Sequence, residues 1–170
     1  TGDIHGIWTE QFNAMMHTAE SIRTDTAQTK MDFSGMSQEE LGGFLRGLHG
    51  SAVAAGRSLS KLPKIAEARK LIDVGGGSGG LAIALCEEHP LLHATVVDLP
   101  SVVPITAQAV EESGLTDRIS VATADILNTP LEGEFDIATA RAFFQVLSVD
   151  QSRKAAQNIA AGLVSSGTLF

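Results

Sequence analysis

The sequence predicts an α/β fold, in which a parallel sheet carries helices on both faces and follows a purely helical segment. Up to residue 67 apolar residues recur only at helical spacing, whereas from residue 68 short apolar runs alternate with helical patterns. Such alternation is typical of βαβ units, which build parallel sheets. Five glycines also crowd into LIDVGGGSGG at residues 71–80, where the first apolar run meets the first helical pattern. We therefore predict a helical segment over residues 1–67 and an α/β domain over residues 68–170.

The helical segment contains two predicted helices, over residues 7–22 and 37–62. At the start of the second, Ser37 and Glu40 form a capping box, in which each side chain satisfies a backbone N–H of the first helical turn. The apolar residues of this helix recur at spacings of three and four: Leu41, Phe44, Leu45 and Leu48. The polar stretch between the two helices predicts a connector.

In the α/β part, the apolar runs predict strands and the longer patterns predict helices. The strands are expected over residues 70–74, 93–99, 118–126 and 134–143, and the helices over residues 79–90, 102–115 and 148–163. The last residues, SSGTLF, are similar to the beginning of another strand, and the chain does not start with Met. We therefore expect it to be part of a longer protein.

Composition argues against several classes of function. The net charge is −8, the pI is near 5.0, and the 12 Lys and Arg residues are scattered, whereas a protein that coats nucleic acid needs clustered positive charge. A small-molecule partner fits better. Cys86 is the only cysteine, which excludes a disulfide framework and a cysteine-based metal site and indicates a reducing compartment. No apolar run reaches membrane-spanning length and no signal segment opens the chain, so we expect a cytoplasmic protein without a membrane partner or metal.

The glycine-rich turn is the first candidate binding site. In a parallel sheet, ligands bind beyond the carboxyl ends of the strands, where the first strand turns into its helix. Glycine tolerates positive φ and lets a ligand approach backbone N–H groups at a helix N-terminus. The pattern Gly75-x-Gly77-x-x-Gly80 also satisfies the dinucleotide fingerprint, so the turn alone leaves a nicotinamide cofactor open.

Three acidic residues narrow the choice of ligand. Asp73 lies just before the glycines, where its negative charge disfavours a diphosphate and favours a cationic ligand. Asp98 ends the second predicted strand and can accept hydrogen bonds from both ribose hydroxyls, as it would in either NAD or another adenosine cofactor. Asp125 ends the third and can accept from an adenine amino group, with Ile126 beside the ring. S-adenosylmethionine carries an ammonium, a ribose and an adenine, and therefore fits all three acids.

Four stretches resemble, in order and spacing, the motifs of the class I S-adenosylmethionine-dependent methyltransferases. They are LIDVGGGSGG, ATVVDLPSVV, DRISVATADIL and FDIATARAFFQVLSVDQSRKAAQNIAAGL. The chain is most similar to small-molecule O-methyltransferases, the family related to plant caffeate and bacterial antibiotic O-methyltransferases, over about residues 40–170. The resemblance implies a Rossmann-like sheet truncated at its C-terminus. It also implies that residues 1–67 include the linker from an N-terminal dimerisation domain, and that the full-length protein is a homodimer.

The resemblance further implies roles for individual residues. Gly75 and Gly77 would approach the methionine part of the cofactor, and Arg141 would lie near it. The cofactor set is then Asp73, Gly75, Gly77, Asp98, Leu99, Asp125, Ile126 and Arg141. Phe44 and Leu48 lie on a helix that lines the cofactor and acceptor pocket in the family, although ordinary core packing explains their spacing equally well.

The chain departs from the family at the position of the catalytic base. Relatives carry a His after the fourth strand that removes a proton from the acceptor hydroxyl, and Gln145 stands at that position here. An amide does not bind a proton near neutral pH, so Gln145 cannot serve as a base. His49 is the one histidine expected near the pocket. Because thioether and amine acceptors need no base before attack, S- or N-methylation becomes a candidate beside O-methylation. An NAD-dependent oxidoreductase, or a cofactor-binding domain without transferase activity, remains the alternative.

Overall fold

The computed structural model describes residues 3–29 and 35–170, which fall into two compact units, Thr1–His49 and Gly50–Phe170. The two units divide within a helix. We predicted a different kind of limit, between residues 67 and 68, at which the α/β domain begins. That limit stays a prediction. Within the described ranges, no helix combines the length and the apolar character needed to cross a membrane.

The first unit is helical, as predicted, but its first helix is interrupted. Helix α1 spans Asp3–Met15 and α2 spans Thr18–Thr24, whereas we predicted one helix over residues 7–22. His17 leaves helical geometry with φ −94° and ψ 3°, and its carbonyl accepts hydrogen bonds from both the N–H and the hydroxyl of Ser21, each at 3.0 Å. The N–H of His17 donates to the Ala14 carbonyl, three residues back, at 3.1 Å, so a tighter turn replaces the α-helical pattern there, which the apolar spacing alone does not reveal.

Helix α3 spans Gln38–Leu59 and begins at the predicted capping box. The N–H of Ser37 donates to Glu40 Oε2 at 2.9 Å, and the N–H of Glu40 donates to Ser37 Oγ at 3.2 Å. The N–H and the hydroxyl of Ser37 both donate to Glu40 Oε2, at 2.9 and 2.8 Å, and these two hydrogen bonds lower the pKa of the Glu40 carboxyl. The chemistry of the first turn therefore confirms the predicted helix start.

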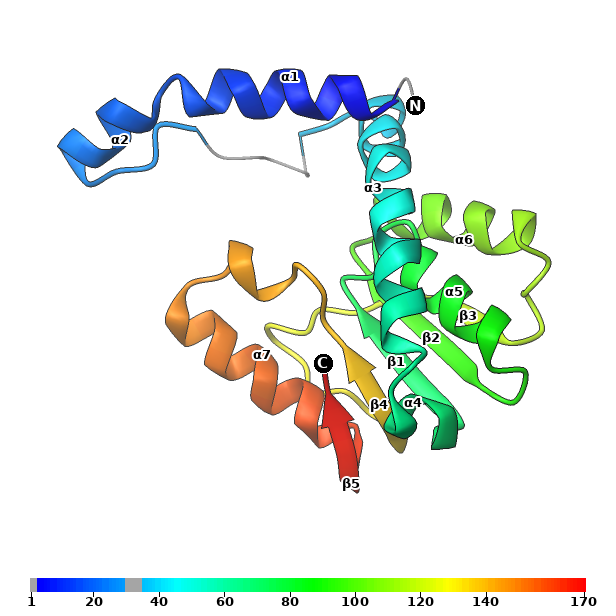
Figure 1. The fold of residues 1–170 in the computed structure, drawn as a ribbon. Helices are drawn as coiled ribbons and strands as arrows, with labels where there is room; N and C mark the ends of the chain where they lie inside the picture. Colours follow the sequence, from blue (N-terminus) through cyan, green and yellow to red (C-terminus); the bar gives the residue numbers. More distant parts are fainter. Residues whose placement is uncertain (1–2, 30–34) are drawn as a thin grey trace. The chain divides into compact units, whose positions relative to one another are not determined.

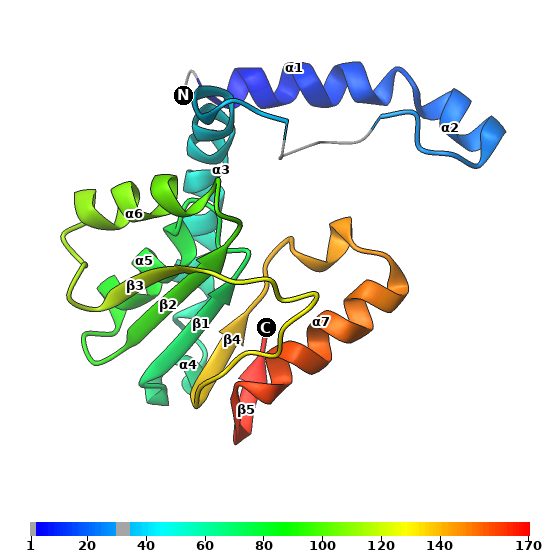
Figure 2. The ribbon, with the colours of Figure 1, turned by 180° about the vertical axis from the view of Figure 1, so that it is seen from behind.

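The second unit contains a five-stranded parallel sheet in the order β3-β2-β1-β4-β5 (Figures 1 and 2). Its strands are Lys70–Val74, His93–Asp98, Ile119–Thr123, Phe135–Thr139 and Leu163–Leu169 for β1 to β5. The alternation of strands and helices is confirmed, and β5 already begins before the final SSGTLF stretch. The third and fourth strands end earlier than predicted, because the chain turns at Asp125 and Arg141 rather than continuing extended.

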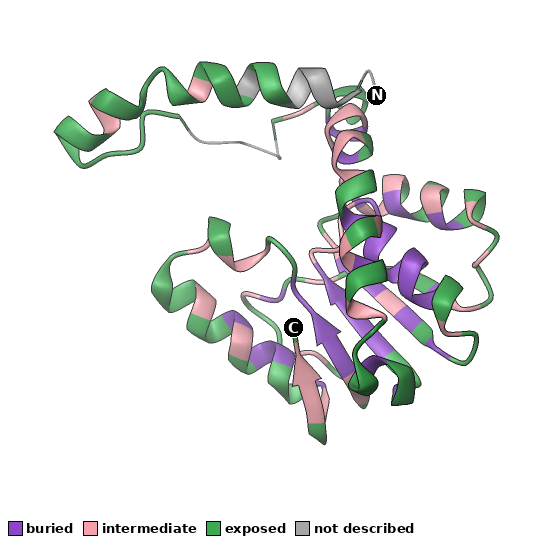
Figure 3. Cartoon of the chain, viewed as in Figure 1, coloured by how far each residue is buried: buried purple, intermediate pink, exposed green. Residues whose placement is uncertain are grey.

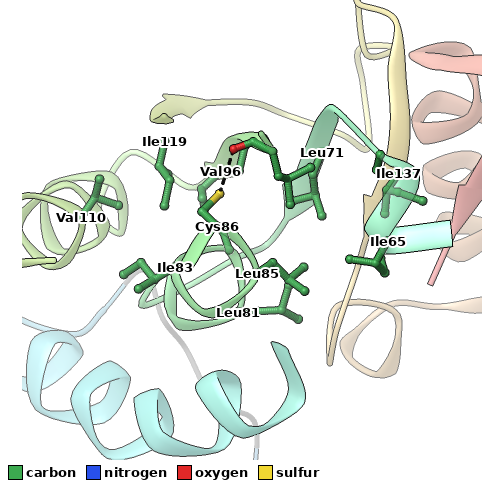
Figure 4. Close-up of a cluster of buried hydrophobic side chains, with 14 residues drawn as sticks. Ile65, Leu71, Leu81, Ile83, Leu85, Cys86, Val96, Val110, Ile119 and Ile137 are labelled. Carbon is green, nitrogen blue, oxygen red and sulfur yellow. Dashed lines mark hydrogen bonds between the residues drawn. The ribbon is translucent and has the colours of Figure 1, made fainter. Parts of the chain in front are cut away.

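Helices cover both faces of this sheet. They are α4 (Pro63–Glu67), α5 (Gly80–Glu88), α6 (Val103–Glu112) and α7 (Val149–Ala161), with a short 3-10 helix η1 at Phe144–Val146. Leu71 packs on one face with residues of α4, α5 and α6 (Figure 4), and Ile72 packs on the other with residues of α7. Helix α5 is buried from Gly80 to Cys86, whereas α7 buries only a stripe (Figure 3). The sheet is thus held between two hydrophobic cores, one on each face.

The end of α3 packs tightly on α5 within the second unit. A Cβ added at Gly56 would lie 2.7 Å from the Leu81 carbonyl oxygen and 2.8 Å from Ala84 Cβ. His89, at the end of α5, is 3.1 Å from the Ser60 carbonyl oxygen through Nε2. These contacts hold the last turns of α3 against the helix that follows the glycine-rich turn.

Candidate functional site

The glycine-rich turn leaves the end of β1 in a conformation that requires glycine. The N–H of Gly75 donates to the Val97 carbonyl at 2.8 Å, and the chain then passes through positive φ at Gly75 (64°), Gly77 (55°) and Gly79 (71°). A Cβ at Gly75 would lie 2.8 Å from Cδ2 of Phe143. The turn therefore needs glycine both for its left-handed backbone and because an aromatic ring covers it.

Asp73 lies directly beneath this turn. Its side chain is 2% exposed, Oδ1 accepts a 2.7 Å hydrogen bond from the Thr139 hydroxyl, and Oδ2 is buried without a partner. Oδ2 would be 2.8 Å from a Cβ at Gly76, so the carboxyl reaches the underside of the turn. The pKa of Asp73 is raised to about 7, mainly by burial and to a smaller extent by the negative charge of Asp98. The hydrogen bond from Thr139 and the positive charge of Arg141 act in the opposite direction.

Asp98, at the end of β2, contacts the same turn. Its Oδ2 accepts from the N–H of Gly77 at 2.8 Å, and its Oδ1 accepts from the N–H of Leu99 at 2.7 Å. Burial raises the pKa of Asp98, and the two backbone hydrogen bonds oppose that rise. Because each carboxylate oxygen has two lone pairs, one acceptor direction remains on each oxygen. Two neighbouring ligand hydroxyls match this arrangement.

Asp125 lies beyond the end of β3, next to Asp98 in the sheet. Thr123 pairs with Asp98, and the N–H of Ala124 donates to the Asp98 carbonyl at 3.3 Å. Asp125 itself is exposed and follows the strand by two residues, so it flanks β3 rather than ending it as predicted. Ile126 is buried, in agreement with its apolar character.

Arg141 follows β4 at the same edge. Its guanidinium is exposed and donates to the Ser51 hydroxyl at 3.3 Å, and its charge favours ionisation of Asp73. The next residue, Ala142, has φ 59°, which is rare for a residue with a side chain. This left-handed step leads into Phe143, the residue that covers Gly75.

The structure places the other predicted site residues in both units. Leu99 supplies its N–H to Asp98, but its side chain is exposed. Gln145 is exposed on η1. Phe44, Leu48 and His49 belong to the first unit. Their roles in the pocket stay predictions.

Two threonines that support the site were missed by the sequence reasoning. Thr139 donates to Asp73, and the buried Thr106 of α6 donates to the Gly77 carbonyl. Finding Thr139 requires knowing that β1 and β4 are neighbours in a register that pairs Asp73 with Thr139. The local sequence carries no signal for Thr106, because its partner is 29 residues away.

These features fit an adenosine cofactor with a positively charged amino-acid part. The partnerless Oδ2 of Asp73 is a buried acceptor, for which an ammonium group is a suitable partner. Gly76 carries no side chain that could crowd this oxygen, since a Cβ there would lie 2.8 Å from it. A diphosphate at the turn would bring negative charge toward Asp73, which disfavours a dinucleotide.

Residues 32–159 match the family described as O-methyltransferase domain. The 3-hydroxy-5-methyl-1-naphthoate 3-O-methyltransferase of Streptomyces sahachiroi is 30% identical over 159 residues, covering 91% of this chain and 46% of that protein. The N,N-dimethyltransferase OxyT of Streptomyces rimosus is 35% identical over 98 residues, covering 58% of this chain and 28% of that protein. The structure of human N-acetylserotonin methyltransferase in complex with SAM aligns with a TM-score of 0.76 at 20% identity, covering 94% of this chain and 48% of that one.

The chain thus spans less than half the length of each of these proteins. The family match confirms the predicted family, and the structural match confirms the predicted Rossmann-like fold. The family's cofactor is S-adenosylmethionine, the cofactor that the sequence predicted. With its match extending over most of its residues, this chain belongs to the O-methyltransferase domain family.

Proposed function

We propose that the complete protein containing this chain is an S-adenosylmethionine-dependent methyltransferase that acts on a small-molecule acceptor. The observation that carries the proposal is the contact of two buried or half-buried carboxylates with one glycine turn. Asp73 lies beneath the turn with an unpartnered oxygen, and Asp98 accepts from the N–H of Gly77. The family supports the reaction class, and the acceptor is part of the proposal.

Each site residue has one proposed task. Gly75 and Gly77 let the methionine part approach the backbone, and Asp73 provides the carboxylate for its ammonium. Asp98 accepts from the two ribose hydroxyls through the lone pairs that its backbone contacts leave. Asp125 accepts from the adenine amino group, Ile126 offers an apolar surface, and the charge of Arg141 favours the ionised form of Asp73.

The chain's contribution to methyl transfer is positioning. S-adenosylmethionine, when bound, supplies a methyl group that its sulfonium has already activated. Holding an acceptor in line with that methyl removes much of the entropic barrier to transfer. Phe143 over Gly75 provides an apolar surface at the turn, which helps to exclude water.

We further propose an acceptor atom that needs no general base from this chain, such as a thioether sulfur or a neutral amine. Gln145 cannot accept a proton. Within the second unit, His93 begins β2 and His89 ends α5, so both lie at the amino ends of the strands, away from Asp73 and Asp98. Relatives support variation of the acceptor, because one is named as an O-methyltransferase and another as an N,N-dimethyltransferase. His49 is the base to test if the acceptor is a hydroxyl.

The assembly and location are also proposals. Helix α1 exposes Trp8, Phe12 and Met15 at spacings of four and three, and a helix with such an apolar stripe fits a subunit interface. We propose a homodimer of the complete protein, with residues 1–67 as the connection to its dimerisation part. The free, buried thiol of Cys86 supports a cytoplasmic location.

The test combines binding with turnover. Calorimetric titration of the complete protein should show tighter binding of S-adenosylhomocysteine than of NAD. Methyl transfer from labelled S-adenosylmethionine should then be measured against phenol, amine and thioether acceptors. Absence of S-adenosylhomocysteine binding would overturn the proposed function. Binding without transfer to any class of acceptor would favour the domain without transferase activity.

A further inference from the structure

The segment from Asp125 to Leu131 is held in place by α7, a helix that carries none of the predicted cofactor residues. Asn158, buried in α7, donates through Nδ2 to the Ile126 carbonyl at 2.7 Å. The backbone carbonyl of Asn158 accepts from the N–H of Leu131 at 2.9 Å. The backbone of this segment is therefore anchored at two points, and its side chains project from a fixed frame.

Within this frame, the carboxylate of Asp125 is almost fully occupied. Oδ1 accepts from the N–H groups of Leu127 and Asn128, both at 3.2 Å, which uses its two acceptor directions. Oδ2 accepts from Nδ2 of Asn128 at 2.8 Å. A carboxylate offers about four acceptor directions, so one remains, and it is on Oδ2.

Asn128 is itself oriented by its second partner. Its Oδ1 accepts from Nζ of Lys154 on α7 at 3.4 Å, while its Nδ2 faces Asp125. A lysine can only donate, so the amide oxygen must face Lys154 and the amide nitrogen must face the carboxylate. The side chain of Asn128 thus presents a donor to Asp125.

We propose that Asn128 is a specificity-determining positioning residue, which fixes the Asp125 carboxylate so that its one remaining acceptor reads the amino group of adenine. The inference rests on the proposed role of Asp125 in cofactor binding and adds to it. Asn128 acts through Asp125 and holds no ligand itself. Without its donor, Oδ2 regains a second open direction and the carboxylate can rotate into solvent, because both residues are exposed.

A single directed acceptor distinguishes adenine from its deaminated form. The 6-amino group of adenine donates a hydrogen bond, whereas the 6-oxo group of hypoxanthine places an acceptor at the same position. Two acceptors facing each other repel, so a rigid carboxylate rejects the oxo base more strongly than a mobile one. Selectivity between the two bases therefore reports on the orientation of Asp125.

The test measures the dissociation constants of S-adenosylhomocysteine and S-inosylhomocysteine for the complete protein. Asn128→Ala removes the donor, and Asn128→Asp keeps the shape of the side chain while replacing the donor with an acceptor. Both should lower the selectivity for S-adenosylhomocysteine by about three- to tenfold, the scale of the net contribution of one ordinary hydrogen bond. Asp125→Ala should lower it at least as far. Thr129→Ala, an exposed change in the same segment, should leave the ratio unchanged.

The ratio of two affinities is independent of the fraction of protein that is folded, so a loss of stability alone does not change it. If Asp125→Ala lowers the selectivity and both Asn128 variants retain it within twofold, the inference is overturned and the proposed function stands. If Asp125→Ala also retains it, Asp125 does not read the base and the inference is overturned as well. If the unmodified protein binds neither ligand, the proposed function itself has failed.

Discussion

Each carboxylate oxygen of Asp98 accepts one hydrogen bond from a backbone N–H and keeps one acceptor direction open. Asp98→Ala should therefore remove the ribose hydrogen bonds and weaken S-adenosylhomocysteine binding by about 2–3 kcal/mol, the scale for hydrogen bonds to a charged group. Isothermal titration of the complete protein measures this. Asp117→Ala removes an exposed carboxylate elsewhere and should have no effect. Unchanged affinity in Asp98→Ala would remove this residue from the site.

Asp73 should make the stability of the ligand-free protein depend on pH. Its pKa is raised from 3.8 to about 7, so the folded state holds the proton more tightly than the unfolded state does. The stabilisation from the protonated form is complete below the unfolded pKa and is lost as pH rises through the folded value. Relative to Asp73→Asn, the unmodified protein should therefore lose stability between pH 4 and pH 7.

Urea unfolding at a series of pH values checks this expectation. The groups facing Asp73 are Thr139, Asp98 and Arg141, and Arg141→Gln should move the transition to higher pH because it removes the charge that opposes the rise. Parallel stability profiles for the unmodified protein and Asp73→Asn would contradict the raised pKa.

A substitution at Gln145 tests whether methyl transfer to the acceptor needs a general base. If the acceptor is a thioether or an amine, Gln145→His should leave kcat/KM nearly unchanged. If it is a hydroxyl, a restored base can raise the rate, because general bases contribute about 10²–10⁴-fold. His49→Ala is the companion change. A severe loss in His49→Ala, with an acid limb near neutral pH in the unmodified enzyme, would return the protein to base-assisted O-methylation.

At the scale of elements, substitutions at two glycines of α3 test its contact with α5. A Cβ at Gly56 would meet backbone and Cβ atoms of α5 below 3.0 Å, whereas a Cβ at Gly50 meets nothing within 4 Å. Gly56→Ala should lower the free energy of unfolding by about 1–3 kcal/mol through overpacking. Gly50→Ala should raise it by about 0.5–1 kcal/mol, since alanine favours the helix. If urea unfolding gave a higher free energy of unfolding for both variants than for the unmodified protein, the tight packing at Gly56 would be ruled out.

The elements could be predicted from sequence where the signal is local. The strand over residues 70–74, the alternation after it and the capping box at Ser37 depend on neighbouring residues, and all three are confirmed. The third strand was predicted too long, since the turn at Asp125 depends on which partners its carboxylate finds. The partner of Asp73 could not be predicted, because strand order decides that β4 lies beside β1.

At the scale of the whole molecule, the exposed stripe on α1 predicts the state of assembly. Trp8, Phe12 and Met15 are 60%, 60% and 63% exposed. The complete protein should be a dimer in light scattering at micromolar concentration, and the double change Trp8→Glu with Phe12→Glu should shift it toward monomer. Asn13→Glu adds a charge to another face of the same helix and should leave the dimer intact. A complete protein that is monomeric before any change would contradict the proposal.

The peptide groups around Gly77 have a consequence for ligands that differ from the natural one. The N–H of Gly77 donates to Asp98 and the carbonyl of Gly77 accepts from the Thr106 hydroxyl, so the middle of the turn is already held by two hydrogen bonds without a ligand. Ordering one residue costs about 1–2 kcal/mol, and that loss occurs during folding rather than during binding. The same rigidity prevents the turn from adapting its shape. Cofactor analogues enlarged on their amino-acid part should thus bind more weakly than S-adenosylmethionine itself.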